Sequence, residues 1–127
     1  MRVESYDDIS DYYDKALPFL LEKEAENNLI LGILDAIKKN PHRYGENDPV
    51  LTTVIDGAEL KLVAIRTPPF NQLLSYTNDL GSIGFLVDTL NEDPTDIPGV
   101  FGTKECAKKF ARLWCKGKKI KANWTPV

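Results

Sequence analysis

The hydrophobic pattern of this chain changes its period at residues 45–49, and this change constrains the fold more than any other feature of the sequence. Before this polar segment, apolar residues recur at the spacing of amphipathic helices, and after it they alternate as they do in strands. Two segments rich in β-forming residues, 51–55 and 59–65, flank the dipeptide Asp56-Gly57, which favours a tight type I′ turn. The sequence therefore predicts a β-hairpin that is preceded by helices.

A first helix is expected directly after a short opening strand at residues 2–6. Asp7 and Asp8 offer side-chain oxygens for its N-cap, and acidic residues suit the first turn of a helix. Pro18 lacks a backbone donor, so we expect a kink or a break near Ala16. The expected apolar positions of this helix are Ile9, Tyr13, Ala16, Leu17, Leu20 and Leu21.

A second helix is expected from about residue 25 to residue 39. Asn40-Pro41 ends it, because proline disfavours helical geometry in the residue before it. The expected apolar face consists of Leu29, Ile33 and Ile37, flanked by Ile30 and Leu34.

A polar joint at residues 22–28 links the two helical patterns and holds candidate binding residues. Asn27 and Asn28 are poor helix formers, because amide side chains compete for backbone hydrogen bonds. We expect them to cap the second helix or to bond to a neighbouring loop; contact with a substrate is the alternative. The three glutamates of the joint are expected to be solvated, with a substrate-facing acidic rim as the alternative. They are Glu22, Glu24 and Glu26.

The second half of the chain is expected to add strands and two more helices. Thr67-Pro68-Pro69 ends the second hairpin strand, because proline cannot donate to a ladder. We then expect a third strand at 72–76, a helix at 79–91 and a short strand at 100–101. These are followed by a helix that Thr103 caps and Gly117 ends, and by a closing strand at 118–125. The expected apolar positions are Ile83, Leu86, Val87 and Leu90 in the first helix, and Ala107, Phe110, Ala111 and Trp114 in the second.

Together these elements predict one α/β domain over residues 1–127. Their order is β-α-α-β-β-β-α-(β)-α-β, which implies a mixed sheet with flanking helices. The hydrophobic content of 43% and the charged content of 28% are those of a globular protein. No apolar run approaches the roughly 20 residues of a membrane span, and residues 1–4 lack the apolar stretch of a secretory signal. A cytoplasmic location without membrane contact is therefore expected.

Charge is unevenly spread along the chain. Residues 104–121 hold eight basic groups and one acidic group, a net of +7, whereas the other positions hold 8 basic and 18 acidic residues, a net of −10. Such a basic segment could attract phosphates or nucleic acid. We favour a solvated helix face near the acidic surface of its own domain, because nucleic-acid footprints usually interleave aromatic residues and glycines among the charges. Nucleic acid is therefore not expected as a partner.

The inventory of reactive side chains is small. His42 is the only histidine and neither cysteine belongs to a C-x-x-C pair, so no metal site is expected. Cys106 and Cys115 are nine positions apart in one expected helix, or about 13 Å along its axis, which excludes a disulfide between them there. None of the serines lies in a nucleophile-elbow pattern, so the sequence assigns no catalytic residue.

One turn has the context of a phosphate-binding site. Residues 78–84 lie between an expected strand and an expected helix, and Gly81 and Gly84 have no side chain that would block a phosphate. Gly81, Ser82 and Gly84 are therefore candidate cofactor contacts. However, Asp79 would repel a phosphate, and the segment matches neither the dinucleotide fingerprint nor the Walker motif. Helix capping with tight strand–helix packing is the favoured interpretation.

Several short motifs cover nearly the whole chain in a recognisable order. They are Pro18-Phe19-Leu20 with the segment 24–32; Arg66-Thr67-Pro68-Pro69 with Asn71; Pro98-Gly99-Val100 followed by Gly102; and Phe110-Ala111 with Trp114. In these motifs the chain resembles the first half of two-part bacterial and archaeal proteins of the GNAT acetyltransferase superfamily. The resemblance implies a mixed, mostly antiparallel sheet, and Asn71 joins Asn27 and Asn28 as a candidate substrate contact.

The chain also departs from that family. Catalytic GNAT domains place an Arg/Gln-x-x-Gly-x-Gly/Ala loop after their fourth strand, where it holds the cofactor pyrophosphate. Here Arg66 is followed by Thr67-Pro68-Pro69 and Gln72 by Leu73-Leu74-Ser75, and the sequence stops near Val127, where the relatives continue. The resemblance therefore implies a non-catalytic N-terminal lobe that shapes an acceptor cleft. No cofactor is expected in this lobe; a C-terminal catalytic half would hold acetyl-CoA.

Two other interpretations stay open. The chain could be a stand-alone binding or dimerisation module in which a second copy replaces the missing half. It could also be a small enzyme that uses the turn at residues 78–84 as a phosphate cradle. The expected partner is thus a catalytic half or a second copy of the chain.

Overall fold

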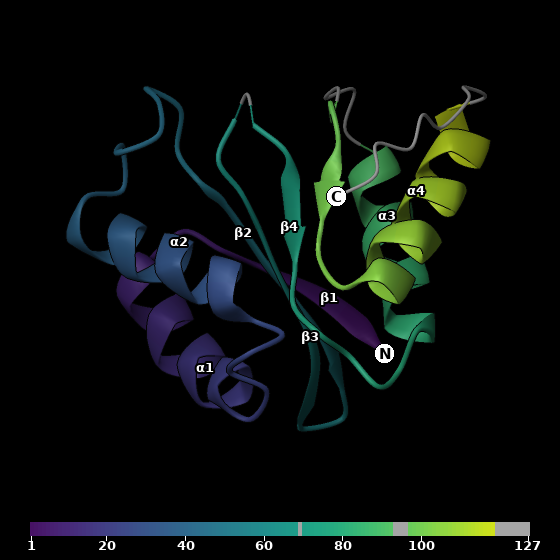
Figure 1. Cartoon of the computed structure of the whole chain (residues 1–127), viewed down its shortest axis with the longest axis horizontal. Helices are drawn as coiled ribbons and strands as arrows, with labels where there is room; N and C mark the ends of the chain where they lie inside the picture. Colours follow the sequence, from purple (N-terminus) through teal and green to yellow (C-terminus); the bar gives the residue numbers. More distant parts are fainter. Residues whose placement is uncertain (69, 93–96, 119–127) are drawn as a thin grey trace.

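The computed structural model describes residues 1–68, 70–92 and 97–118, which form an α/β fold around a five-stranded mixed sheet (Figure 1). The expected α/β class is thereby confirmed. In chain order the elements are β1 (Arg2–Tyr6), α1 (Ile9–Leu21), α2 (Asn28–Lys39), β2 (Val50–Asp56), β3 (Glu59–Arg66), β4 (Gln72–Leu74), α3 (Gly81–Asn91), β5 (Val100–Phe101) and α4 (Lys104–Lys118). Of the closing strand expected at residues 118–125, Lys118 belongs to α4 and the rest lies outside the described residues.

The strands follow one another across the sheet in the order β1-β2-β3-β4-β5. Neighbours are antiparallel except β4 and β5, which are parallel. The predicted hairpin of β2 and β3 is confirmed, but Asp56 pairs with Glu59, so the two turn residues are Gly57-Ala58. Gly57 has a φ of 63°, a conformation that glycine adopts without steric strain. The predicted turn dipeptide, Asp56-Gly57, is therefore wrong by one residue.

Two separate hydrophobic cores lie on the two faces of the sheet, because both faces of the central strands are buried. Along β3, Leu62 and Ala64 point to one core and Val63 and Ile65 to the other, which accounts for the continuous apolar run of this strand. Figure 1 shows α1 and α2 on one side of the sheet and α3 and α4 on the other. The α1–α2 core consists of Tyr12, Ala16, Leu20, Ile30, Leu34, Ile37, Leu51, Val63 and Ile65, and the α3–α4 core of Val54, Leu62, Ala64, Leu74, Ile83, Leu86, Val87, Ile97, Cys106, Phe110 and Trp114.

Helix α1 begins as predicted. The Asp8 carboxylate accepts a hydrogen bond of 2.8 Å from the backbone N–H of Ser10, which is an N-cap contact. Of the expected kink or break near Ala16, the break does not occur: the helix continues through Pro18 to Leu21. Pro18 is exposed and lies in the last turn, where its ring meets solvent and few helical residues follow it.

The buried face of α1 differs from the predicted one. Tyr12, which the predicted face omits, is 0% exposed, whereas Tyr13 is only half-buried. The Tyr12 hydroxyl lies 2.9 Å from the carbonyl oxygen of Thr52 and 2.8 Å from that of Ala64, and it donates toward both. Because its one polar group is satisfied, this ring can be fully buried. Burial raises the pKa of Tyr12 well above its ordinary value.

Helix α2 begins at Asn28 rather than near residue 25, and the predicted apolar face is corrected. Leu29 is 42% exposed and Ile33 is half-buried. The residues that α2 buries are Ile30, Leu34 and Ile37. Apolar residues are spread over more than half of the circumference of this helix, so packing against α1 and the sheet selects the ones that become buried. Leu29 is left at the surface as a consequence.

The second half of the fold needs three corrections. Strand β4 ends at Leu74 rather than at residue 76, and α3 begins at Gly81 rather than at residue 79. Gly117 does not end α4, which extends to Lys118. A Cβ atom at Gly117 would lie 2.7 Å from Nδ2 of Asn91, so the glycine allows α4 to approach α3 closely. The buried residues of α4 are Cys106, Phe110 and Trp114.

Candidate functional site

A groove opens where the parallel pairing of β4 and β5 ends. The two strands pair over only two residues each: Gln72 lies opposite Val100, and Leu73 lies opposite Phe101. The backbone N–H of Gln72 donates to the carbonyl of Gly99 over 2.9 Å. The pairing stops because the chain leaves β5 shortly after Phe101 to form α4.

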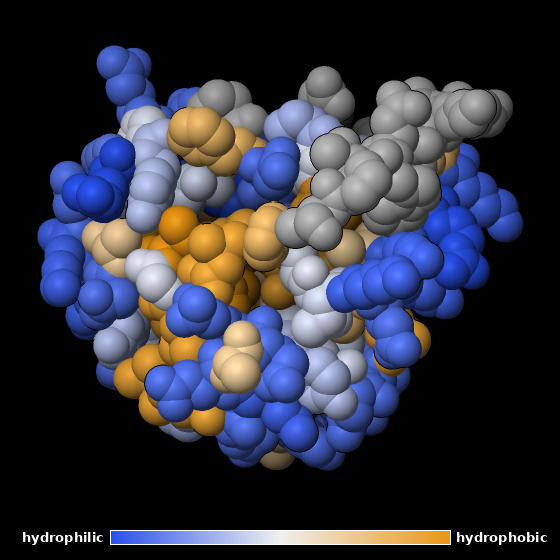
Figure 2. Space-filling view, in the orientation of Figure 1, coloured by the Kyte–Doolittle hydropathy of each residue, from blue (hydrophilic) through white to orange (hydrophobic). Residues whose placement is uncertain are grey.

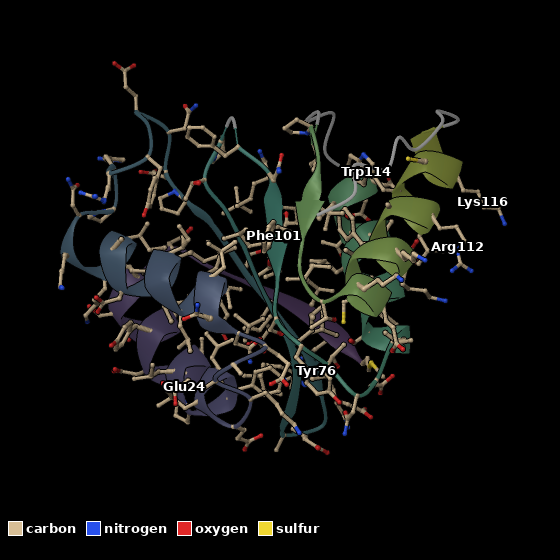
Figure 3. All side chains as sticks on the ribbon, viewed as in Figure 1. Glu24, Tyr76, Phe101, Arg112, Trp114 and Lys116 are labelled. Carbon is tan, nitrogen blue, oxygen red and sulfur yellow. The ribbon has the colours of Figure 1, made fainter. Side chains whose placement is uncertain are left out.

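This β4–β5 groove has a volume of about 260 Å³. One wall is the connection between α1 and α2 together with the start of α2; the other wall is formed by β4, β5 and the residues before α4. Figure 2 shows an apolar area over α2 and β4 that is hollowed near the centre of the view, and Figure 3 labels Phe101 on this face. The lining residues are Ala25, Glu26, Asn28, Leu29, Ile30, Leu73, Leu74, Phe101, Gly102 and Thr103.

Gly102 closes the bottom of the groove. A Cβ atom at this position would lie 3.2 Å from Cβ of Leu74 and 3.3 Å from its carbonyl oxygen. The backbone after β5 therefore lies directly against Leu74, and glycine is the residue that permits this approach.

The chemistry of the groove combines large apolar side chains with polar ones. Leu29 and Phe101 come from opposite walls and are 42% and 46% exposed. Glu26 and Asn28 are exposed and line the same groove. Such a lining suits a small ligand with an apolar chain beside a cationic or hydrogen-bonding group, because a few polar groups in an apolar pocket fix the orientation of a ligand.

Asn27 is a structural residue beside the groove. Its side chain is 2% exposed; Nδ2 donates to the carbonyl of Leu20 over 3.0 Å, and Oδ1 accepts from the backbone N–H of Tyr76 over 2.7 Å. The expectation that it bonds to a neighbouring loop is thereby confirmed. It ties the end of α1 to the segment after β4 and makes no side-chain cap contact in α2. Of the three candidate substrate contacts, only Asn28 lines the groove.

Asn71, the third candidate substrate contact, lies outside the groove. It is exposed and immediately precedes β4. A Cβ atom at Gly99 would lie 2.9 Å from its Oδ1 atom, so this side chain packs against the backbone that leads into β5. The structure therefore does not bring Asn71 together with Asn28.

The start of α3 has a carboxylate where a phosphate cradle was considered. Oδ1 of Asp79 accepts a hydrogen bond of 3.1 Å from the backbone N–H of Gly81, and the Asp79 carbonyl accepts one of 2.6 Å from the Ser82 hydroxyl. Ser82 is fully buried, and a Cβ atom at Gly84 would contact Leu113 of α4 at 3.9 Å. The three candidate cofactor residues thus do not converge on a common ligand. The Asp79 carboxylate thus bonds to the first residue of α3, although the N-cap residue, Leu80, makes no side-chain cap hydrogen bond. The expected packing against a strand is corrected at Gly84, because this residue faces helix α4.

The described residues that line the groove include one carboxylate, Glu26, and no histidine or cysteine. Within the part of the chain that the structure describes, no three His, Cys, Asp or Glu side chains are grouped as a metal ion requires. His42 makes an exposed contact of 2.8 Å with Asp48 on a distant loop. Glu4, whose pKa is lowered mainly by the hydrogen bond from Arg2, lies on β1 and not in the groove. No helix among the described residues has both the length and the apolar character to cross a membrane.

Sequence reasoning missed most of the groove. Leu73, Phe101 and Thr103 had been assigned only to strands or to a helix cap, and Leu29 to a buried helix face. Two signals pointed to this place: the alternative of a substrate-facing acidic rim, which includes Glu26, and the candidate substrate contact Asn28. Comparison with known proteins gave no match to a family model, to a curated protein or to a solved structure.

Proposed function

We propose that this chain is a non-catalytic lobe of a GNAT-like N-acyltransferase, and that its β4–β5 groove forms part of the site for an amine acceptor. The observation that carries the proposal is the groove at the end of a short parallel strand pair, which follows three antiparallel strand pairs. This arrangement supports the sequence resemblance to the first half of two-part acetyltransferases. In this role the lobe packs against a catalytic half that holds acetyl-CoA.

The lining of the groove favours an amine over a coenzyme. The exposed Glu26 carboxylate attracts an ammonium group, while Leu29 and Phe101 offer apolar surface to an alkyl chain. At the start of α3 the Asp79 carboxylate already bonds to the Gly81 N–H, and its charge repels a diphosphate. Alignment of the amine with the thioester, and stabilisation of the developing oxyanion, would then be tasks of the catalytic half.

Calorimetric titration with acetyl-CoA tests the cofactor part of the proposal. The isolated chain should give no binding heat beyond that of dilution. An Asp79→Asn chain is the matched variant, because it keeps the side-chain oxygen that caps Gly81 and removes the charge. Binding of acetyl-CoA by the unmodified chain at micromolar concentrations contradicts the lobe interpretation.

Titration with hexylamine, followed by amide chemical shifts, tests the acceptor part. We expect shifts at groove residues such as Leu73 and Phe101. Glu26→Gln should weaken binding about twofold to fivefold, the range expected for one exposed charge pair. Glu24→Gln is the control, since Glu24 belongs to the same connection (Figure 3) but is not part of the groove lining. An absence of shifts, or equal effects of the two variants, rules out an amine site here.

A second candidate function is a stand-alone module in which another copy of the chain covers the groove. The exposure of Leu29 and Phe101 favours it, because two large apolar side chains meet solvent in one hollow. Such a dimer should persist when the salt concentration rises, and Phe101→Ser should abolish it. Sedimentation of a strict monomer removes this candidate.

A further inference from the structure

A row of cations runs along the outer side of α4. Lys104, Lys108, Arg112 and Lys116 follow one another at intervals of four residues, and all four are exposed. Figure 2 shows the corresponding hydrophilic surface over α4, and in Figure 3 Arg112 and Lys116 point away from the sheet. Within residues 1–68, 70–92 and 97–118, none of the four forms an ion pair. The expectation that this face lies near acidic groups of its own domain therefore has no support there.

A complementary row of anions runs along α1. Asp11 and Asp14 lie three residues apart in α1, and Asp7 directly precedes the N-cap residue, Asp8. Asp7, Asp11 and Asp14 are exposed and are likewise absent from the ion pairs of the described residues. Lys15 is the one cation within α1. Residues 7–26 carry seven acidic and two basic groups, a net of −5, and residues 104–118 carry six basic and one acidic group, a net of +5.

These two rows cannot neutralise each other within one molecule. Helix α1 packs on one face of the sheet and α4 on the opposite face (Figure 1). Two layer spacings, on the order of 20 Å, therefore separate them. At physiological ionic strength the Debye length is about 8 Å, so solvent and salt screen an attraction across that distance. Only contact between molecules can bring the two rows together.

We infer that copies of this chain associate head to tail, with the α4 row of one copy against the α1 row of the next. The dimensions are similar: Lys108 and Lys116 are about 12 Å apart along the axis of α4, and the N-cap residue Asp8 and Asp14 are about 9 Å apart along that of α1, with Asp7 directly before Asp8. Each row thus presents three charges over a similar length. Because the two surfaces differ, the contact is heterologous and leads to a chain or a ring of copies rather than a two-fold dimer.

The acidic character of the whole molecule argues for this partner over nucleic acid. The chain has a net charge of −3 and a pI of about 5.2, so a polyanion that approaches α4 is repelled by the rest of the molecule. A second copy presents its own acidic row and avoids this repulsion. The association needs neither the groove nor an acyl acceptor, so it stands or falls separately from the proposed function.

Sedimentation equilibrium of the unmodified chain at two salt concentrations is the first test. At about 0.01 M salt the average mass should rise with protein concentration and pass beyond that of a dimer. At about 0.15 M salt the association constant should be about tenfold lower, because the Debye length falls from about 30 Å to about 8 Å. Association through the apolar groove would not weaken in this way. A monomer at the lower salt concentration overturns the inference.

Charge-reversed variants locate the contact. One variant carries Lys108→Glu, Arg112→Glu and Lys116→Glu; the other carries Asp7→Lys, Asp11→Lys and Asp14→Lys. Each alone should sediment as a monomer with the circular dichroism of the unmodified chain. An equimolar mixture should associate again, because each native row then finds its complement on the other variant.

A matched control separates this contact from general attraction between oppositely charged molecules. Glu46→Lys, Glu59→Lys and Glu92→Lys change the net charge by the same amount at scattered exposed positions. Because this control keeps both native rows, it should associate with itself at low salt as the unmodified chain does, whereas the α1 variant stays a monomer; a monomeric control overturns the inference. A labelled single-stranded oligonucleotide, followed by fluorescence anisotropy, is the last arm. Binding of the oligonucleotide through Lys108 and Arg112 by a chain that stays monomeric assigns the α4 row to nucleic acid instead.

Discussion

Replacement of Asn27 by alanine should destabilise the fold more than any other single change in the polar joint. The Asn27 side chain is 2% exposed and makes two hydrogen bonds, one to the carbonyl of Leu20 at 3.0 Å and one from the N–H of Tyr76 at 2.7 Å. The carbonyl of Leu20 keeps a second donor, the N–H of Lys23 at 3.3 Å, but the N–H of Tyr76 loses its partner.

The expected magnitude follows from these contacts. Two hydrogen bonds contribute about 1 kcal/mol each, and a partly buried N–H without an acceptor adds a penalty of about 1 kcal/mol. The free energy of unfolding of Asn27→Ala should therefore fall by about 3 kcal/mol. Asn28→Ala is the matched control, because Asn28 is the same residue type at the next position and is exposed. Its effect should stay within about 0.5 kcal/mol.

Urea denaturation followed by circular dichroism measures both variants, and hydrogen exchange adds a local readout. The amide of Tyr76 should exchange faster in Asn27→Ala, because the side-chain acceptor that protects it is gone. A loss below about 1 kcal/mol for Asn27→Ala, or an equal loss for Asn28→Ala, refutes the assignment of Asn27 as the link between α1 and the segment after β4.

Three further predictions concern glycines and the buried tyrosine. Gly117→Ala should lower the free energy of unfolding by less than about 1 kcal/mol, because the new Cβ would lie 2.7 Å from Nδ2 of Asn91 and displace the end of that side chain rather than backbone. Gly32→Ala should raise the free energy of unfolding by about 0.5–1 kcal/mol, because a Cβ at this position in the interior of α2 meets no atom within 4 Å. Thermal denaturation of the two alanine variants measures both effects. Tyr12→Phe should lower the free energy of unfolding by about 1 kcal/mol through loss of the hydroxyl contacts. Because burial raises the pKa of Tyr12 in the folded chain above the 10.0 of a free tyrosine, its stabilising contribution is complete below pH 10.0 and is lost as pH rises toward the folded pKa. The alkaline loss of stability should therefore be smaller in Tyr12→Phe.

The hairpin and the N-cap of α1 could be predicted from the sequence, because both depend on interactions between residues that are close together in the chain. Runs rich in β-forming residues identified β2 and β3, and Gly57 marked the turn through a backbone conformation that other residues adopt with strain. The error of one residue arose because Asp56-Gly57 is a favoured turn dipeptide, whereas strand pairing extends to Asp56 and Glu59. The Asp8 cap was likewise a local property of the sequence.

The buried faces of α1 and α2 could not be chosen from periodicity alone. Leu29 and Ile30 are neighbours with equal hydrophobicity, and only packing against α1 and the sheet decides that Ile30 is buried and Leu29 is not. For Tyr12 the decisive factor is a pair of carbonyl oxygens on two strands, which no pattern within α1 reveals. The groove could not be predicted for the same reason, because its walls come from three segments that meet only in the folded chain.

Each pair of helices is stabilised by a core of its own, because the central strands divide their side chains between the two faces of the sheet. Val63→Ala would weaken the packing of α1 and α2 against the sheet. Leu62→Ala would instead weaken the packing of α3 and α4. One pair of helices should accordingly unfold locally and become open to proteolysis while the sheet and the other pair stay folded. A protein engineer could thus rebuild the helices of one flank and leave the opposite flank as it is.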